Sequence, residues 1–202
     1  MARSADKKRK VKAVALDFDG VITNLDIDWK AAVHKASEIA GYNIKSLLSF
    51  YENSFGTPVF QMVSSEMEKI ELEAARRTQV LPFVKESLQK LSEKQVEVYI
   101  VSIQSFRVVK EFLDQHGIAS FFKDIITRER CPSKKAQVEC LLKKTGNIPC
   151  QIMLIDDSKR NINTCKELGV VCFHFQRKQN LSEAKETWDK ILNLLNSQNS
   201  LR

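Results

Sequence analysis

The sequence predicts an α/β fold in which a mostly parallel sheet is sandwiched by helices, with a small helical segment inserted after the first strand. Short apolar runs alternate with helical patterns along most of the chain, which is typical of this class. The stretch 26–79 breaks that alternation, because it holds helical patterns and no convincing strand. The length of 202 residues allows one domain, or one domain with a moderate insertion.

The predicted strands are short runs of apolar residues, as expected where helices cover both faces of a parallel sheet. The runs are 12–17 (KAVALD), 96–102 (VEVYIVS), 151–157 (QIMLIDD) and 170–175 (VVCFHF), with a weaker one at 124–127. Parallel neighbours of this kind require crossover connections, which are right-handed.

Helical patterns supply those connections. They span 83–94, 105–116, 133–145 and 159–168, and a last amphipathic pattern spans 181–195. Gly117, Gly146 and Gly169 follow three of them, and glycine just past the last turn is a helix stop signal. The last pattern carries its apolar residues on one face and should cover the sheet.

The inserted segment reads as three helices, at 29–40, 44–51 and 58–77. The third carries an apolar stripe at spacings of three and four residues: Phe60, Val63, Met67, Ile70 and Ala74. A small helical subdomain with its own core explains the stripe, and a coiled-coil partner site is the alternative. The predicted organisation is therefore a basic arm at 1–11, a core at 12–25 and 80–202, and a helical subdomain at 26–79.

The net charge of +7 is concentrated at the N-terminus, where residues 1–12 carry +5 and leave +2 for the rest. A nearly neutral body argues against nucleic acid as the partner. The run Lys7-Lys8-Arg9-Lys10 resembles a nuclear localisation signal, and a solvated arm is the alternative.

Targeting and redox signals point to the cytoplasm. No apolar stretch approaches the roughly 18 residues that span a bilayer, and the N-terminus shows no secretory signal, so we expect no membrane partner. The five cysteines lack zinc-site spacing, so we expect reduced thiols.

The polar residues with chemical potential follow the predicted strands. They are Asp17 and Asp19 at the end of the first strand, Ser102 at the end of the second, Asp156 and Asp157 at the end of the 151–157 run, and Lys134 and Lys135 before an intervening helix. Ligands bind beyond the carboxyl ends of the strands in such sheets. If these strands are neighbours, each pair of carboxylates about 4 Å apart costs on the order of 4 kcal/mol at an effective dielectric near 20. Such a cluster requires a cation or shifted pKa values, and oxygen ligands favour Mg²⁺.

Four motifs carry a family resemblance: ALDFDGVITN (15–24), VYIVS (98–102), CPSKK (131–135) and LIDDSKRN (154–161). In this order they resemble the haloacid dehalogenase (HAD) superfamily, in its phosphatase branch. The resemblance covers nearly the whole chain and implies a Rossmann-like core. Residues 26–79 take the place of the helical C1-type cap of that family.

The resemblance assigns a role to each strand-end residue. Asp17 would be the nucleophile that forms an aspartyl-phosphate, and Asp19 the general acid and base. Mg²⁺ would be held by Asp17, by the backbone carbonyl of Asp19, and by Asp157, with Asp156 ligating or orienting. Ser102 and a lysine would bind the phosphoryl group.

The choice of lysine rests on a second likeness. Ser133-Lys134 before an amphipathic helix resembles the third motif of magnesium-dependent phosphatases of the MDP type, which favours Lys134 over Lys135. Those enzymes lack a cap of this size, so the likeness concerns the active-site scaffold and not the substrate. Val21, Asn24 and Ile103 depart from residues that are frequent in the superfamily.

The resulting expectation is a Mg²⁺-dependent phosphatase acting on a small phosphorylated metabolite. The alternatives are a phosphomutase using the same intermediate, and a non-catalytic interaction protein using the basic arm. Candidates for contacting the non-phosphate end of the substrate are Asn24, Lys30, His34, Arg76 and Arg77, for each of which an ordinary surface position is the alternative.

Overall fold

The computed structural model describes residues 10–176 and 180–197, so the predicted basic arm lies almost wholly outside the described residues. Within them the chain forms a parallel sheet with the strand order β3-β2-β1-β4-β5. The strands are β1 (Ala13–Leu16), β2 (Glu97–Val101), β3 (Phe122–Ile126), β4 (Ile152–Asp156) and β5 (Val171–His174). The predicted α/β fold is confirmed.

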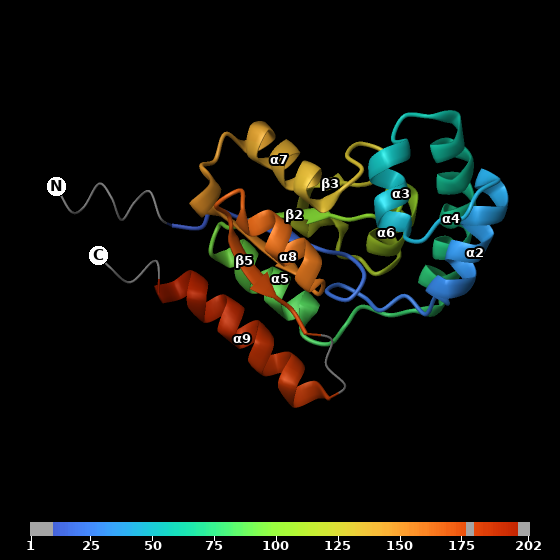
Figure 1. Cartoon of the computed structure of the whole chain (residues 1–202). Coiled ribbons are helices and arrows are strands. Elements are labelled where there is room, and N and C mark those ends of the chain that lie inside the picture. Colours follow the sequence, from blue (N-terminus) through green and yellow to red (C-terminus); the bar gives the residue numbers. More distant parts are fainter. Residues whose placement is uncertain (1–9, 177–179, 198–202) are drawn as a thin grey trace.

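Helices cover both faces of the sheet (Figure 1). Packed on one face are α5 (Val84–Glu93), α6 (Phe106–Gln115) and α9 (Leu181–Ser197), and on the other α7 (Lys134–Thr145) and α8 (Lys159–Lys166). Side chains alternate along β1: Val14 and Leu16 belong to the first apolar cluster, and Ala13 and Ala15 to the second. Burial on both faces explains why this strand is apolar at every position.

A group of three helices lies at one end of the sheet (Figure 1): α2 (Trp29–Ala40), α3 (Leu47–Ser54) and α4 (Pro58–Arg77). They share an apolar cluster that includes Phe50, Tyr51, Phe60, Val63 and Met67. This group therefore has a core of its own, separate from the two clusters that flank the sheet.

Several element boundaries differ from the sequence prediction by two or three residues, among them both ends of α3 and the start of β3. Helix α3 begins three residues later than predicted, because Ile44 is already packed in the helical cluster while Ser46, the residue before the helix, is extended at φ −155°. Strand β3 begins at Phe122 rather than at residue 124. It is an edge strand whose Lys123 and Asp124 interrupt the apolar run, so the sequence pattern is weak there.

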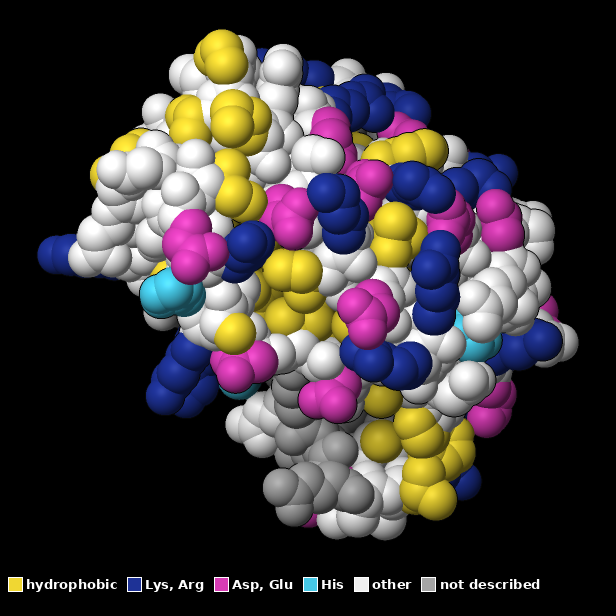
Figure 2. Space-filling model, turned by 90° about the vertical axis from the view of Figure 1, so that its right-hand side faces the viewer, with side chains coloured by type: hydrophobic (Ala, Val, Ile, Leu, Met, Phe, Trp, Pro, Cys, Tyr) yellow, Lys and Arg dark blue, Asp and Glu magenta, His cyan; other side chains and the backbone are white. Residues whose placement is uncertain are grey.

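Charges of both signs are interspersed on the side of the molecule formed by the three helices (Figure 2). Many are paired one turn apart, as are Arg77 with Glu73 at 3.1 Å and Lys69 with Glu66 at 2.8 Å. This face is therefore not a continuous basic surface for a polyanion. Among the described residues no helix has the length and apolar character needed to cross a bilayer.

Candidate active site

The carboxyl ends of the three central strands lie level with one another. Leu16 of β1 is in register with Ile100 of β2 and with Ile155 of β4. The next residue, Asp17, continues the ladder by donating its amide to the carbonyl of Ile155 at 2.9 Å. Asp17, Ser102 and Asp156 therefore leave the same edge of the sheet, although they are far apart in sequence.

A tight turn after β1 places the second acid. Phe18 is fully buried and packs edge-to-face on Phe112, with ring centroids 5.1 Å apart. Gly20 adopts φ +89°, which a residue with a side chain rarely does, and its amide donates to the carbonyl of Thr23 at 2.7 Å. The carboxylate of Asp19 accepts the amide of Leu25 at 2.8 Å, so its orientation is fixed by the returning chain.

Three carboxyl groups converge at the sheet edge. One oxygen from each of Asp17, Asp156 and Asp157 lies within 4.8 Å of the other two. Asp156 is fully buried, and it accepts the amide of Ser158 at 2.8 Å and the side-chain amide of Asn161 at 3.1 Å. These donors fix the orientation of the Asp156 carboxylate.

Lys134 enters the cluster from the first turn of α7. Its Nζ lies 2.9 Å from Asp17 Oδ1 and 3.2 Å from Asp156 Oδ2, and it also donates to the carbonyl of Val101. The side chain is buried. Lys135 points elsewhere, because its ammonium pairs with Glu167 at 2.9 Å on the surface.

Burial and charge act in opposite directions on these groups. Burial raises the pKa of Asp17 well above its ordinary value, Lys134 lowers it, and the neighbouring Asp156 and Asp157 raise it further. Burial alone would lower the pKa of Lys134, but Asp17 and Asp156 together raise that pKa. The lysine therefore stays charged, and the three acids still exceed it by two negative charges when all are ionised.

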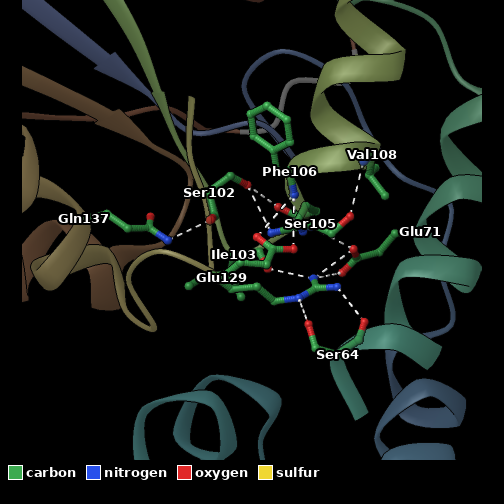
Figure 3. Close-up of polar contacts among 11 residues, drawn as sticks. Ser64, Glu71, Ser102, Ile103, Ser105, Phe106, Val108, Glu129 and Gln137 are labelled. Atoms are coloured by element: carbon green, nitrogen blue, oxygen red, sulfur yellow. Dashed lines mark hydrogen bonds and ion pairs between the residues drawn. The ribbon is translucent and has the colours of Figure 1, made fainter. Parts of the chain in front are cut away.

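Ser102 follows β2 and is fully buried. Its hydroxyl donates to the side-chain oxygen of Gln104, and its carbonyl accepts the amide of Gln137 at 2.7 Å (Figure 3). Its own amide donates to the carbonyl of Ile126 at 3.0 Å. Ser102 is thus held by hydrogen bonds to β3 and to α7.

A cavity of about 400 Å³ lies between the strand ends and the three helices. Its lining includes Asp17, Asp19 and Asp157 from the core, Trp29, Val33, Leu47, Leu48 and Tyr51 from the helices, and Lys45 and Ser46 from the loop before α3. The hydroxyl of Tyr51 is buried without a hydrogen-bond partner among the described residues. A concave site of this size with a few polar groups suits a small molecule.

The residues proposed from the sequence for the far end of the substrate do not line this cavity. Asn24, Lys30 and Arg76 are exposed away from it, and His34 and Arg77 line a second cavity of about 550 Å³ between α2 and α4. The ordinary surface position therefore holds for Asn24, Lys30 and Arg76, because polar or basic character alone does not say which face of a helix meets the core.

Several lining residues were not predicted from the sequence, among them the polar Glu71, Gln104 and Asn161. Asn161 lies five residues after Asp156, inside a motif that had already been singled out. Glu71 follows Met67 by four residues and so falls on the apolar stripe of α4, where an acid is anomalous. This interruption of the apolar stripe could have identified Glu71 from the sequence. No sequence pattern points to Gln104.

Comparison with known proteins identifies the family of the chain. A model of the haloacid dehalogenase-like hydrolases matches residues 14–175. A phosphoglycolate phosphatase of Vibrio cholerae is 26% identical over 192 residues, covering 83% of this chain and 84% of that protein. The phosphoglycolate phosphatase of Vibrio parahaemolyticus is 24% identical over 191 residues, covering 82% of this chain and 84% of that protein.

Solved structures share the fold. A HAD-superfamily hydrolase of Geobacter sulfurreducens superposes with a TM-score of 0.59 at 16% identity, covering 92% of this chain and 96% of that one. A haloacid dehalogenase-like family protein of Streptococcus pneumoniae gives a TM-score of 0.61 at 15% identity, covering 91% and 98%. At such identities the likeness concerns the fold alone.

Proposed function

The chain belongs to the haloacid dehalogenase-like hydrolases, in their phosphatase branch, and from that premise we propose that it hydrolyses a small phosphate monoester through a covalent intermediate on Asp17. The observation that carries the proposal is the meeting of Asp17, Asp156 and Asp157 beside one cavity, with Lys134 paired to Asp17 and Asp156.

In the proposed reaction a carboxylate oxygen of Asp17 attacks phosphorus, and the bond from phosphorus to the ester oxygen breaks. Asp19 gives its proton to the departing alkoxide. In the second step Asp19 removes a proton from water, whose oxygen attacks phosphorus and releases phosphate, restoring Asp17. Ser102 and Lys134 would bind the phosphoryl oxygens, since phosphoryl transfer depends mainly on positioning and charge stabilisation.

The acid cluster fits a divalent cation. Three carboxylates against one ammonium leave excess negative charge, and their oxygens are the ligands that Mg²⁺ prefers. Asp17, Asp157 and the backbone carbonyl of Asp19 would hold the ion, with Asp156 ligating or orienting. When bound, Mg²⁺ would neutralise charge on the transferring group.

We also propose residues 26–79 as a cap that limits the substrate to the cavity of about 400 Å³. Apolar walls from Trp29, Val33 and Leu47, with the polar Lys45 and Ser46 beside them, suit a short phosphorylated metabolite. Phosphoglycolate, named for the two Vibrio relatives, is a candidate of that size.

The function is tested by incubating the protein with Mg²⁺ and a panel of phosphorylated sugars, nucleotides and short acids that includes phosphoglycolate. We expect release of one phosphate per molecule of ester consumed, for p-nitrophenyl phosphate as well as for the preferred substrate. Phosphate appearing at another carbon of the substrate, with stimulation by a bisphosphate, would instead indicate a phosphomutase. No turnover of any ester would refute the enzyme assignment.

Magnesium should stabilise the fold. A ligand present at about 100 times its Kd adds about 2.7 kcal/mol to the free energy of unfolding. For a chain of this size each kcal/mol raises the melting temperature by about 2–4 °C, so an increase of about 5–10 °C is expected when Mg²⁺ reaches saturation. Differential scanning calorimetry from 0 to 10 mM Mg²⁺ measures it.

Two variants make this measurement specific. Asp157→Asn should reduce the shift, because it removes one carboxylate of the cluster. Asp124→Asn should keep it, since that acid lies on edge strand β3 and pairs with Lys144 and Arg130. A melting temperature that does not respond to Mg²⁺ in the unmodified protein would contradict the metal site.

A further inference from the structure

A buried ion pair joins the helical group to the core next to the cavity. Arg128, two residues beyond β3, and Glu71 of α4 are 0% and 3% exposed. The Nη1 atom of Arg128 lies 2.6 Å and 2.8 Å from the two carboxylate oxygens of Glu71. Buried charges are tolerated when they are paired and their remaining hydrogen-bonding groups are satisfied.

The other hydrogen bonds of Arg128 go to α4 and to the core, and their acceptor residues Ser64 and Ile103 are labelled in Figure 3. On α4, Nε donates to the hydroxyl of Ser64 at 2.8 Å and Nη2 to its carbonyl at 3.0 Å. On the core side, Nη1 also donates to the carbonyl of Ile103 at 2.8 Å. The guanidinium carbon lies 5.2 Å from the centroid of the Tyr51 ring. One side chain thus connects α3, α4 and the loop that follows β2.

Glu71 binds the other end of the loop that follows β2, at Ser105. Its second oxygen accepts the amide of Ser105 at 3.1 Å, and the hydroxyl of Ser105 in turn caps α6 by accepting the amide of Val108 at 3.2 Å. The carbonyl of Ile103 and the amide of Ser105 are therefore both fixed by one ion pair. Ser102, the proposed phosphate ligand, lies immediately before this stretch (Figure 3).

We propose that Arg128 and Glu71 are positioning residues that set the Ser102–Ser105 loop for phosphate binding. This inference rests on the proposed role of Ser102. A second ion pair, between Glu52 of α3 and Arg160 of α8, differs in kind, because it is exposed and 3.6 Å long.

Stability alone does not account for the pair. A buried ion pair can often be replaced by apolar residues of similar volume with little loss of stability, or with a gain. Apolar residues cannot, however, bind a carbonyl at position 103 and an amide at position 105. The double variant Glu71→Leu/Arg128→Met therefore separates packing from loop positioning.

The experiment compares the full-length protein with that double variant, with Glu71→Gln, and with the control Arg130→Met. Arg130 is on the same loop as Arg128, but it pairs at the surface with Asp124, at 2.8 Å. Hydrogen–deuterium exchange measures the exchange rates of the amides of residues 103–106. Competitive inhibition of p-nitrophenyl phosphate hydrolysis by inorganic phosphate measures the affinity of the site for phosphate, and the same assay gives kcat and KM.

We expect the double variant to keep a cooperative unfolding transition, to exchange the 103–106 amides about tenfold faster, and to bind phosphate about tenfold more weakly. Glu71→Gln keeps an acceptor for Ser105 and should show a smaller change in the same direction, so it decides the question if the double variant does not fold. Arg130→Met should match the unmodified protein.

Amide exchange and phosphate affinity that stay within about twofold of the unmodified protein in a folded variant would overturn the proposal. An equal effect of Arg130→Met would also overturn it. The exchange measurement needs no turnover, so it judges the positioning of the loop even where the unmodified protein hydrolyses no ester. That separate outcome would refute the proposed function and not the contacts of Arg128.

Discussion

Asp17→Asn should abolish turnover and leave the fold intact. The amide has nearly the shape of the carboxylate, and its oxygen can still accept the amide of Phe18, which donates to Asp17 at 2.7 Å. It is a poor nucleophile toward phosphorus, so the covalent route is lost. Losing a nucleophile that acts within a catalytic unit costs on the order of 10⁴-fold or more in kcat. Phosphate release in the presence of Mg²⁺ measures the effect.

The matched control is Asp26→Asn. Asp26 is an exposed acid nine positions along the chain and lies outside the cavity that Asp17 lines. Its replacement should leave kcat unchanged, and circular dichroism should give the same spectrum for all three proteins. Activity of Asp17→Asn above about a few per cent of that of the unmodified protein would exclude Asp17 as the nucleophile.

Lys134→Met should lower both activity and stability. The variant leaves Asp17 and Asp156 buried without their shared cation, and breaking such a pair costs about 3–5 kcal/mol. The melting temperature measured without Mg²⁺ should therefore fall, and added Mg²⁺ should recover part of the loss. Loss of a positive group beside the transferring phosphoryl should lower kcat by about 10²–10³.

Lys135→Met is the neighbouring control for this variant. The ammonium of Lys135 lies at the surface and pairs there with Glu167, so solvent screens the interaction and it adds little to stability. Its replacement should change neither kcat nor the effect of Mg²⁺ on stability. A larger loss of activity in Lys135→Met than in Lys134→Met would show that the wrong lysine has been assigned to the phosphate.

The four core motifs could be located from the sequence because their signals are local. An apolar run that ends in acids marks a buried strand and its carboxyl end, as for Asp17 and Asp156. The rule that parallel strands carry ligands at that edge then predicts where these residues go. The edge strand β3 and the start of α3 were placed less accurately, because partial burial and tertiary packing weaken the local pattern at both sites.

The sequence by itself determined the fold class, the family likeness and the strand-end acids, since each depends on residues close together in the chain. Only the tertiary structure decided which lysine faces the acids, which helix faces enclose the cavity, and that Glu71 meets Arg128 across 57 positions. These contacts arise when separate elements pack together. Their energies come from burial and pairing in the folded molecule, which no local pattern records.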